Sequence, residues 1–445
     1  MNSRMAVASC AVALWLTLCA MAGERSKAPS EPAPGAVAAP AVPGRDAKPQ
    51  YNPGACSTPP DQLPYVYTMW KHFTVKERLP SDHIMAVKAD GPRVWVGTEE
   101  GLACIDKRSG KVRTWHCKDE DKDGRSDDPY GLPWKVVTAI DVDKKTGDVW
   151  LGLFGGGLAR FSGGRFDHFH QLNSGLVNDV VYGVAIENDH VWAATTAGAS
   201  RYNTITGEWS IYTEKNAPME EIWNYNVQYD GKGKVFFGIW GSGILEFNCK
   251  KDAEKKGDPW KLYTDPDGEM EIDLYRDDGI VHVIMTGASP AEDILWGSSY
   301  FGCCRYDGRH WRGLYAHETG LPSDFTNNLK ARSANECWFA HDKGLGVVAD
   351  FPTETVVAYT RDPDTLRGKA QVYRCGKLLK TVDMEKAVPH SFIINLDHDG
   401  DDYWVATGKG LGWAIGEGYY PGLRKNPAWL VRSEKERAVA GVSKN

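Results

Sequence analysis

The chain has 445 residues, 42% of them hydrophobic, and a formal net charge of −7. This hydrophobic content is sufficient for a folded core and excludes an intrinsically disordered chain. Charges of both signs are scattered along the sequence, and the lack of a basic block argues against nucleic-acid binding. The 47 Gly, 17 Trp and 19 Tyr residues are typical of an all-β protein with many tight turns.

The first 22 residues have the pattern of an export signal. Arg4 supplies a positive charge, Ala6–Leu18 is an apolar stretch too short to span a membrane, and Ala20–Ala22 has the small-x-small pattern of a cleavage site. We therefore expect a signal peptide over residues 1–22 and a periplasmic or secreted mature protein, with an uncleaved membrane anchor as the alternative. No later segment approaches the about 18 apolar residues of a transmembrane helix.

Residues 23–62 are rich in proline and alanine, as in Pro32-Ala33-Pro34. Such a segment buries too little apolar surface to fold and favours extended, semi-rigid conformations. We interpret it as a linker between the export signal and the folded domain, and we expect no chemistry in it.

Seven copies of one short motif follow the linker. The first is Val94-Trp95-Val96-Gly97-Thr98, followed by Gly101-Leu102. The small residue that ends this strand-like run recurs at positions 97, 152, 194, 238, 297, 340 and 406. Repetition at roughly 40 to 50 residues is typical of propeller blades, and the longer intervals indicate insertions. Tryptophans that recur in phase in these runs are expected to pack between blades: Trp95, Trp150, Trp192, Trp338 and Trp404.

Each copy predicts four short antiparallel strands. An apolar run with period two precedes the motif, as in Ile84–Val87, and a run with an aromatic residue follows it, as in Val112–Trp115. The sequence therefore predicts an all-β fold, a seven-bladed β-propeller over residues 63–416. Residues 68–74 resemble the fourth strand of a blade, and the seventh copy lacks one, so the N-terminal strand is expected to complete the last blade. Residues 417–445 form a polar C-terminal tail.

The combination of Leu79-Pro80-Ser81-Asp82 with the first motif resembles the two-component regulator propeller repeat, as does Gly320–Asp324 before the sixth copy. The resemblance covers about residues 65–416. In that family the propeller is commonly the periplasmic sensory part of a membrane histidine kinase, often associated with glycan-derived signals. We find no membrane helix, kinase or DNA-binding region in this sequence, so a signalling role is expected to need a separate membrane or periplasmic protein.

Aromatic residues concentrate in two sets of loops, those that join second to third strands and those that enter first strands. Tyr182 belongs to the second set. Flat rings with polar neighbours suit sugars or other planar small molecules, and exposed rings also anchor protein partners. The alternative is that several rings fold back and pad the blades. The candidate ligand-binding residues are Trp134, Phe154, Trp223, Trp240, Tyr275, Tyr300, Phe301, Phe325, His341 and His390.

One acidic loop resembles a calcium site. Asp119, Asp121 and Asp123 precede Gly124, and Asp127 adds a further carboxylate. Alternating carboxylates around a glycine turn can bind Ca²⁺ through oxygen ligands. A solvated acidic loop is the alternative, because no glutamate stands at the twelfth loop position. We find no C-x-x-C pair, which disfavours zinc and covalent haem, and the cysteines are expected to be buried fillers or to form one or two disulfides.

Three functions follow from these residues. A ligand-binding or sensory propeller is favoured by the aromatic loops, a protein-interaction scaffold is the alternative, and an enzyme similar to the streptogramin lyases is the third. The last would use His and Glu at the top centre, where His282, His341, His390 and Glu99 are the candidates. No nucleophile motif is present, so we do not expect an enzyme, and fold alone does not decide between the three functions.

Overall fold

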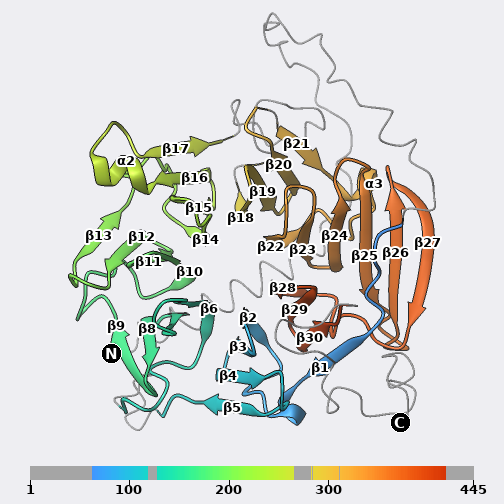
Figure 1. Ribbon diagram of the computed structural model, residues 1–445, viewed down its shortest axis with the longest axis horizontal. Coiled ribbons are helices and arrows are strands. Elements are labelled where there is room, and N and C mark those ends of the chain that lie inside the picture. The colour runs from blue at the N-terminus through green and yellow to red at the C-terminus, as the bar shows by residue number, and fades with distance from the viewer. Residues whose placement is uncertain (1–62, 119–127, 265–281, 283, 310, 417–445) are drawn as a thin grey trace, which may run out of the picture. The chain divides into compact units, whose positions relative to one another are not determined.

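The computed structural model describes residues 63–118, 128–264, 282, 284–309 and 311–416 (Figure 1). Three short helices interrupt the strands of this part of the chain: η2 (Val75–Glu77), α2 (Cys249–Glu254) and α3 (Ala316–Thr319). All other regular elements are β-strands, arranged in seven antiparallel sheets. The predicted all-β propeller is confirmed.

Blades one to four each contain four consecutive strands. Blade one comprises β2 (Ile84–Asp90), β3 (Arg93–Thr98), β4 (Gly101–Asp106) and β5 (Val112–Trp115). Blade two comprises β6 (Val137–Val142), β7 (Val149–Leu153), β8 (Gly157–Ser162) and β9 (Arg165–Phe169). Blade three comprises β10 (Val181–Glu187), β11 (His190–Thr195), β12 (Gly198–Asn203) and β13 (Trp209–Tyr212). Blade four comprises β14 (Asn224–Tyr229), β15 (Lys234–Ile239), β16 (Gly243–Asn248) and β17 (Trp260–Tyr263).

Blade five follows the same plan, whereas blade six has more strands. Blade five comprises β18 (Met285–Ala291), β19 (Ile294–Ser299), β20 (Gly302–Tyr306) and β21 (Trp311–Leu314). Blade six comprises β22 (Thr326–Ala331), β23 (Cys337–His341), β24 (Gly344–Asp350), β25 (Thr355–Arg361), β26 (Gly368–Arg374) and β27 (Lys377–Met384). Its six strands correct the expectation of four, because β26 pairs along the outer edge of β25 and β27 pairs with β26.

Blade seven joins the two ends of the domain. It comprises β28 (Ile393–Asp399), β29 (Asp402–Thr407), β30 (Gly410–Ala414) and β1 (Trp70–Phe73). The pairing runs from Trp70 opposite Ala414 to Phe73 opposite Leu411, as predicted for the N-terminal strand. The first strands of consecutive blades contact one another from β2 round to β28, and β28 contacts β2, so the ring is closed.

The aromatic residue on each second strand packs onto the following blade. Trp150 of blade two, for example, lies in a buried cluster with Val184 and Val191 of blade three. The predicted tryptophan core is confirmed, since all these side chains are at most 5% exposed. The seven residues in this position are Trp95, Trp150, Trp192, Phe236, Trp296, Trp338 and Trp404. Blade four is therefore the exception, with phenylalanine in place of tryptophan.

A β-bulge recurs near the start of every first strand. In blade three, for example, the pairing with β11 shifts between Val181 and Gly183, so Tyr182 has no residue opposite it. The equivalent residue in blade four is Tyr225, because the pairing with β15 shifts between Asn224 and Asn226. A bulged residue leaves the ladder and can re-aim its side chain. In blades three and four the bulge thus carries Tyr182 and Tyr225 at the end of the propeller where the first strands begin, whereas the equivalent Thr138 and Thr286 are buried and bond to the next blade.

Several expectations fall on residues outside the described part. They are the signal peptide, the linker, the tail, the acidic loop with Asp119, Asp121, Asp123 and Asp127, and the candidate Tyr275. No helix among the described residues is long and apolar enough to span a membrane. The thiols of Cys303 and Cys337 are buried and free, whereas Cys375 is disulfide-bonded.

Candidate functional site

Seven aromatic side chains form a continuous series of ring contacts where the first strands begin. We call them the aromatic row: Phe154, Tyr182, Trp223, Tyr225, Trp240, Tyr300 and Phe325. They come from blades two to six, either from the loop that enters a first strand, from its bulge, or from the turn between second and third strands. All except Phe154 are partly exposed. The row is therefore an accessible surface rather than core.

The first half of the row is made by stacked rings. Phe154 contacts Tyr182 edge-on at 5.7 Å between ring centroids. Tyr182 stacks on Tyr225 at 4.9 Å, with 20° between the ring planes. Tyr225 stacks in turn on Trp240 at 5.5 Å and 26°. These separations fall within the range favoured by aromatic pairs, so each ring is held by its neighbours.

The second half crosses from blade four to blade six. Trp240 meets Tyr300 edge-on at 5.2 Å, with 79° between the planes. Tyr300 stacks almost parallel to Phe325 at 3.9 Å and 10°. Trp240 is therefore the member that connects the two halves of the row.

Backbone bonds fix the turns that carry Phe154 and Trp240. The amide of Phe154 donates to the carbonyl of Val136 at 3.0 Å, and that of Trp240 donates to the carbonyl of Trp223 at 2.9 Å. Each residue also forms an isolated β-bridge, Phe154 with Val180 and Trp240 with Ile284. The turn is thereby tied to its own blade and to the segment entering the next one, so the row is preorganised.

The structure brings together five of the residues singled out from the sequence: Phe154, Trp223, Trp240, Tyr300 and Phe325. Trp134 instead packs on its own blade, where its indole donates to the carbonyl of Phe154 at 2.7 Å. A Cβ at Gly156 would lie 2.4 Å from Trp134, so this packing requires the glycine. Phe301 is 37% exposed and stacks on His282 at 4.2 Å, beside the row rather than in it.

The two candidate histidines lie apart from these rings. His341 is fully buried in blade six, where its Nδ1 lies 3.0 Å from the hydroxyl of Thr326. Burial lowers the pKa of His341 to about 3, so the ring is neutral. His390 lies on the loop entering blade seven, and burial together with Lys409 lowers its pKa.

The residues considered for an enzymatic role are spread over four blades. Glu99 of blade one accepts a hydrogen bond from Ser81 at 3.1 Å and contacts Nδ1 of His83 at 3.0 Å. His282, His341 and His390 belong to blades five, six and seven and have contacts of their own. Among the described residues, no three His, Cys, Asp or Glu side chains are placed to hold a metal ion.

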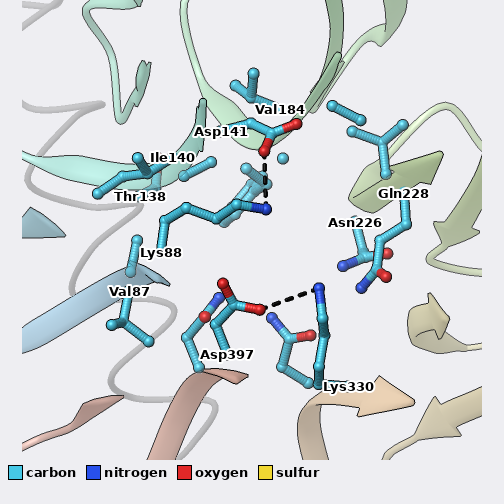
Figure 2. A pocket seen from close by; sticks show the side chains of 18 of the residues that line it. Val87, Lys88, Thr138, Ile140, Asp141, Val184, Asn226, Gln228, Lys330 and Asp397 are labelled. Carbon is cyan, nitrogen blue, oxygen red and sulfur yellow. Dashed lines mark ion pairs between the residues drawn. The ribbon is translucent and has the colours of Figure 1, made fainter. Parts of the chain in front are cut away.

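A cavity with charged side chains lies between the first strands of the blades. The first strands enclose a cavity of about 180 Å³, and Tyr182 of the aromatic row belongs to its lining. Figure 2 shows charged side chains from different blades pointing into it, with Lys88 paired to Asp141 at 2.8 Å and Lys330 paired to Asp397 at 3.1 Å. We call the six polar residues at this level the polar belt: Lys88, Asp141, Gln228, Ser289, Lys330 and Asp397.

The polar belt also bonds to the backbone of neighbouring blades. Asp141 accepts from the amide of Ile186 at 2.9 Å, and Asp397 accepts from the amide of Ala89 at 3.0 Å. Burial would raise the pKa of Asp397, but Lys330 and Lys88 hold it below its usual value. Burial would lower the pKa of Lys88, but Asp141 and Asp397 hold it above its usual value. Asp397 and Lys88 are thus held in their charged forms, and each of these bonds fastens one blade to the next.

The sequence reasoning missed Tyr225 and the whole belt. A usable signal existed, since Lys88, Asp141, Lys330 and Asp397 all stand three residues beyond the bulged residue of their strand. A charge that recurs in phase inside apolar strands indicates a shared polar environment, because isolated buried charges are costly.

No protein-family model and no curated protein matches this chain. Among solved structures it is similar to the extracellular domain of the hybrid two component system BT4673 from B. thetaiotaomicron, with a TM-score of 0.56 and 11% identity over 79% of this chain and 40% of that one. The corresponding domain of BT3049 gives a TM-score of 0.53 and 12% identity over 78% and 41%. Virginiamycin B lyase from Staphylococcus aureus gives 0.52 and 11% over 78% and 99%. At these identities the likeness shows the fold alone, and this chain spans less than half of the two-component proteins' domains.

Proposed function

We propose that this protein is an extracytoplasmic ligand-binding or sensory propeller and that the aromatic row is its binding surface. The observation that carries the proposal is the preassembled, partly exposed series of rings from Phe154 to Phe325 across blades two to six. Rings that already hold one another lose little freedom when a ligand binds, which favours affinity. The predicted export signal, the repeat resemblance and the extracellular two-component domains among the structural neighbours support the same function.

The ligand we propose is a carbohydrate or another small molecule with a flat face. Such a face can lie along the row, because aromatic rings with polar groups at their edges suit flat ligands that carry hydroxyl groups. A sensory role further implies a separate membrane or periplasmic protein that reads the bound state. The calcium site at Asp119, Asp121, Asp123 and Asp127 is proposed as structural support for the same domain.

The test is a thermal melt of the whole chain against a panel of neutral and acidic oligosaccharides, in buffer with calcium or with a chelator. A ligand present at about 100 times its Kd should add about 2.7 kcal/mol to the free energy of unfolding and raise the midpoint detectably. We expect one glycan class to do so, and we expect Trp240→Ala and Tyr300→Ala to abolish the shift. Trp209→Ala, which truncates a partly exposed tryptophan on the outer strand of blade three, is the matched control.

A protein-interaction scaffold is the second candidate, and one feature of blade six favours it. β27 is the outermost strand of its six-stranded sheet, and its Leu378 and Leu379 are 51% and 44% exposed. An exposed outer strand can pair with a strand of another protein. If every oligosaccharide leaves the midpoint unchanged, the row is not a glycan site. Crosslinking to a partner that Leu378→Lys prevents would then support the scaffold.

A further inference from the structure

The interface between blades four and five is built differently from those on either side. In each blade the aromatic residue of the second strand faces the following blade, and blade four alone uses Phe236 there. Trp192 of blade three reaches Phe247 of the next blade at 4.9 Å between ring centroids. Among the described residues, no such ring contact joins Phe236 to Tyr306, which stands in the equivalent place in blade five. Tyr306 instead contacts Tyr263 at 5.5 Å.

The charge opposite this ring is also reversed. Arginine is paired across the strands with the tryptophan in blades two, three and five, as Arg160, Arg201 and Arg305. In blades three and five the guanidinium lies over the indole, at 5.2 and 5.5 Å. The residue paired with Phe236 in blade four is Glu246. In blade four a smaller ring and an acidic residue therefore replace the tryptophan–arginine pair of blades two, three and five.

These two replacements coincide with a pocket of about 440 Å³ between blades four and five. We call it the interblade pocket; its lining includes Phe236, Glu246, Lys261, Tyr263 and Tyr306. It lies beside the turns that join first to second strands, at the opposite end of the strands from the aromatic row. The volume is within the range of small-molecule sites, which is about 300 to 1,000 Å³.

The groups that line the interblade pocket offer an acceptor and a cation. Glu246 is almost completely buried and holds Lys234 at 2.8 Å and the hydroxyl of Tyr263 at 2.8 Å. Lys261 is the cross-strand neighbour of Glu246, and its ammonium lies 4.2 Å from the ring centroid of Tyr263 and 5.6 Å from that of Tyr306. In the described part of the chain Lys261 is exposed and makes no ion pair, whereas the lining carboxylates Glu246 and Asp293 are paired with Lys234 and Lys232.

We propose that the interblade pocket binds a small organic acid whose ring carries a hydroxyl group. The carboxylate of the ligand pairs with Lys261, the ring lies against Tyr306 and Phe236, and the hydroxyl donates to Glu246. Two kinds of molecule have this chemistry, a sugar acid and a hydroxylated aromatic acid. The site is independent of the aromatic row and of the function proposed for it.

The test is calorimetric titration of the whole chain with sodium glucuronate and, separately, with 4-hydroxybenzoate. We expect at least one of these acids to bind, and the one that binds identifies the source. Glucose and phenol, which lack the carboxylate, should bind at least about tenfold more weakly, since a charge-assisted bond is lost. Absence of binding by both acids overturns the proposal.

Two variants test whether the acid binds in the interblade pocket. Phe236→Trp restores the residue that the other six blades carry and should abolish binding by filling the space, with circular dichroism confirming the fold. Lys261→Gln should weaken binding at least about tenfold. Lys145→Gln, which removes an exposed lysine paired with Asp189 at the equivalent end of blade two, is the control and should have no effect. Wild-type affinity in Lys261→Gln overturns the proposal even if Phe236→Trp does not fold. Trp240→Ala, which changes the aromatic row, should leave the affinity of the interblade pocket for the acid unchanged.

Discussion

The aromatic row and the polar belt belong to the same propeller, yet their side chains make opposite kinds of contact. Members of the row, such as Trp240, contact mainly each other and stay partly exposed. Members of the belt, such as Asp397, are buried and bonded to lysines and backbone amides of neighbouring blades. This difference indicates that the belt holds neighbouring blades together. The rings of the row, in contrast, keep solvent-exposed surface that a ligand can contact.

Along the first strand, the position of the row and the position of the belt are only a few residues apart. Tyr182 occupies the bulge of blade three, while Asp141 stands three residues beyond the bulged residue of blade two. The bulge breaks the alternation of faces, so side chains before and after it reach different depths of the channel. Substitutions on either side should therefore change different properties, stability for the belt and binding for the row.

The largest effect is expected from Asp397→Ala. The variant removes the partner of Lys330 and the acceptor for the amide of Ala89, which leaves buried charge without compensation. Breaking a buried pair in this way costs about 3–5 kcal/mol. Urea unfolding of the whole chain measures this. The double variant Lys330→Met with Asp397→Leu should cost less than the single one, and equal costs would mean that the pair does not fasten the blades.

Acid should weaken the belt and leave the row unaffected. The folded-state pKa of Asp397 is below the value of 3.8 that the unfolded chain has, so the unfolded state takes up its proton first. The stability that Asp397 contributes is present above about pH 4 and is lost as the pH falls below that value. Unfolding free energies measured from pH 7 down to pH 2 should thus fall less steeply in Asp397→Ala than in the wild type. The slope of Trp240→Ala should match the wild type, and a change there would show that the row carries linked charge.

Much of this architecture could be predicted because it depends on local pattern. The repeat at Val94–Thr98 and its copies predicted the blades, and the unpaired strand near Trp70 predicted the closure. The extra hairpin β26–β27 was not predicted, because it has no counterpart in the other repeats to mark it. The hairpin pairs along the outer edge of β25, and the repeat pattern does not indicate which blade has a free outer edge.

Some residues of the candidate site could likewise be predicted from local pattern, and others could not. Phe154 and Trp240 were predicted because turns between strands can be read from the repeat. Tyr225 was missed because a bulge is a property of hydrogen-bond register, which composition does not reveal. His341 was expected at the surface since it stands beside a turn, but it is the last residue of β23 and its ring points into blade six.

Tyr182 belongs to the row and also lines the cavity into which the belt points, so it should affect both stability and binding. It stacks on Tyr225 at 4.9 Å and also lines the central cavity. Truncation of a fully buried aromatic side chain costs about 3–5 kcal/mol, so Tyr182→Ala, at a partly exposed site, should cost about 2 kcal/mol. Ligand binding should weaken in parallel. Urea unfolding and the oligosaccharide melt together measure this, with Thr196→Ala on the neighbouring turn as control. A loss of stability without any loss of binding would give Tyr182 a structural role alone.

The smallest effect on stability is expected from Trp240→Phe. Phenylalanine keeps a ring between Tyr225 and Tyr300, and a surface aromatic pair contributes only about 0.5–1.5 kcal/mol, so the free energy of unfolding should fall by less than about 1 kcal/mol. The flat indole surface is nevertheless reduced at the junction of the two halves, so the ligand-induced rise in the melting midpoint should shrink more than the stability does. Trp209→Phe on the outer strand of blade three is the control for a loss of indole elsewhere. If Trp240→Phe instead lowers stability as much as Asp397→Ala, the row is a structural element like the belt, and the binding surface must be sought elsewhere on the propeller.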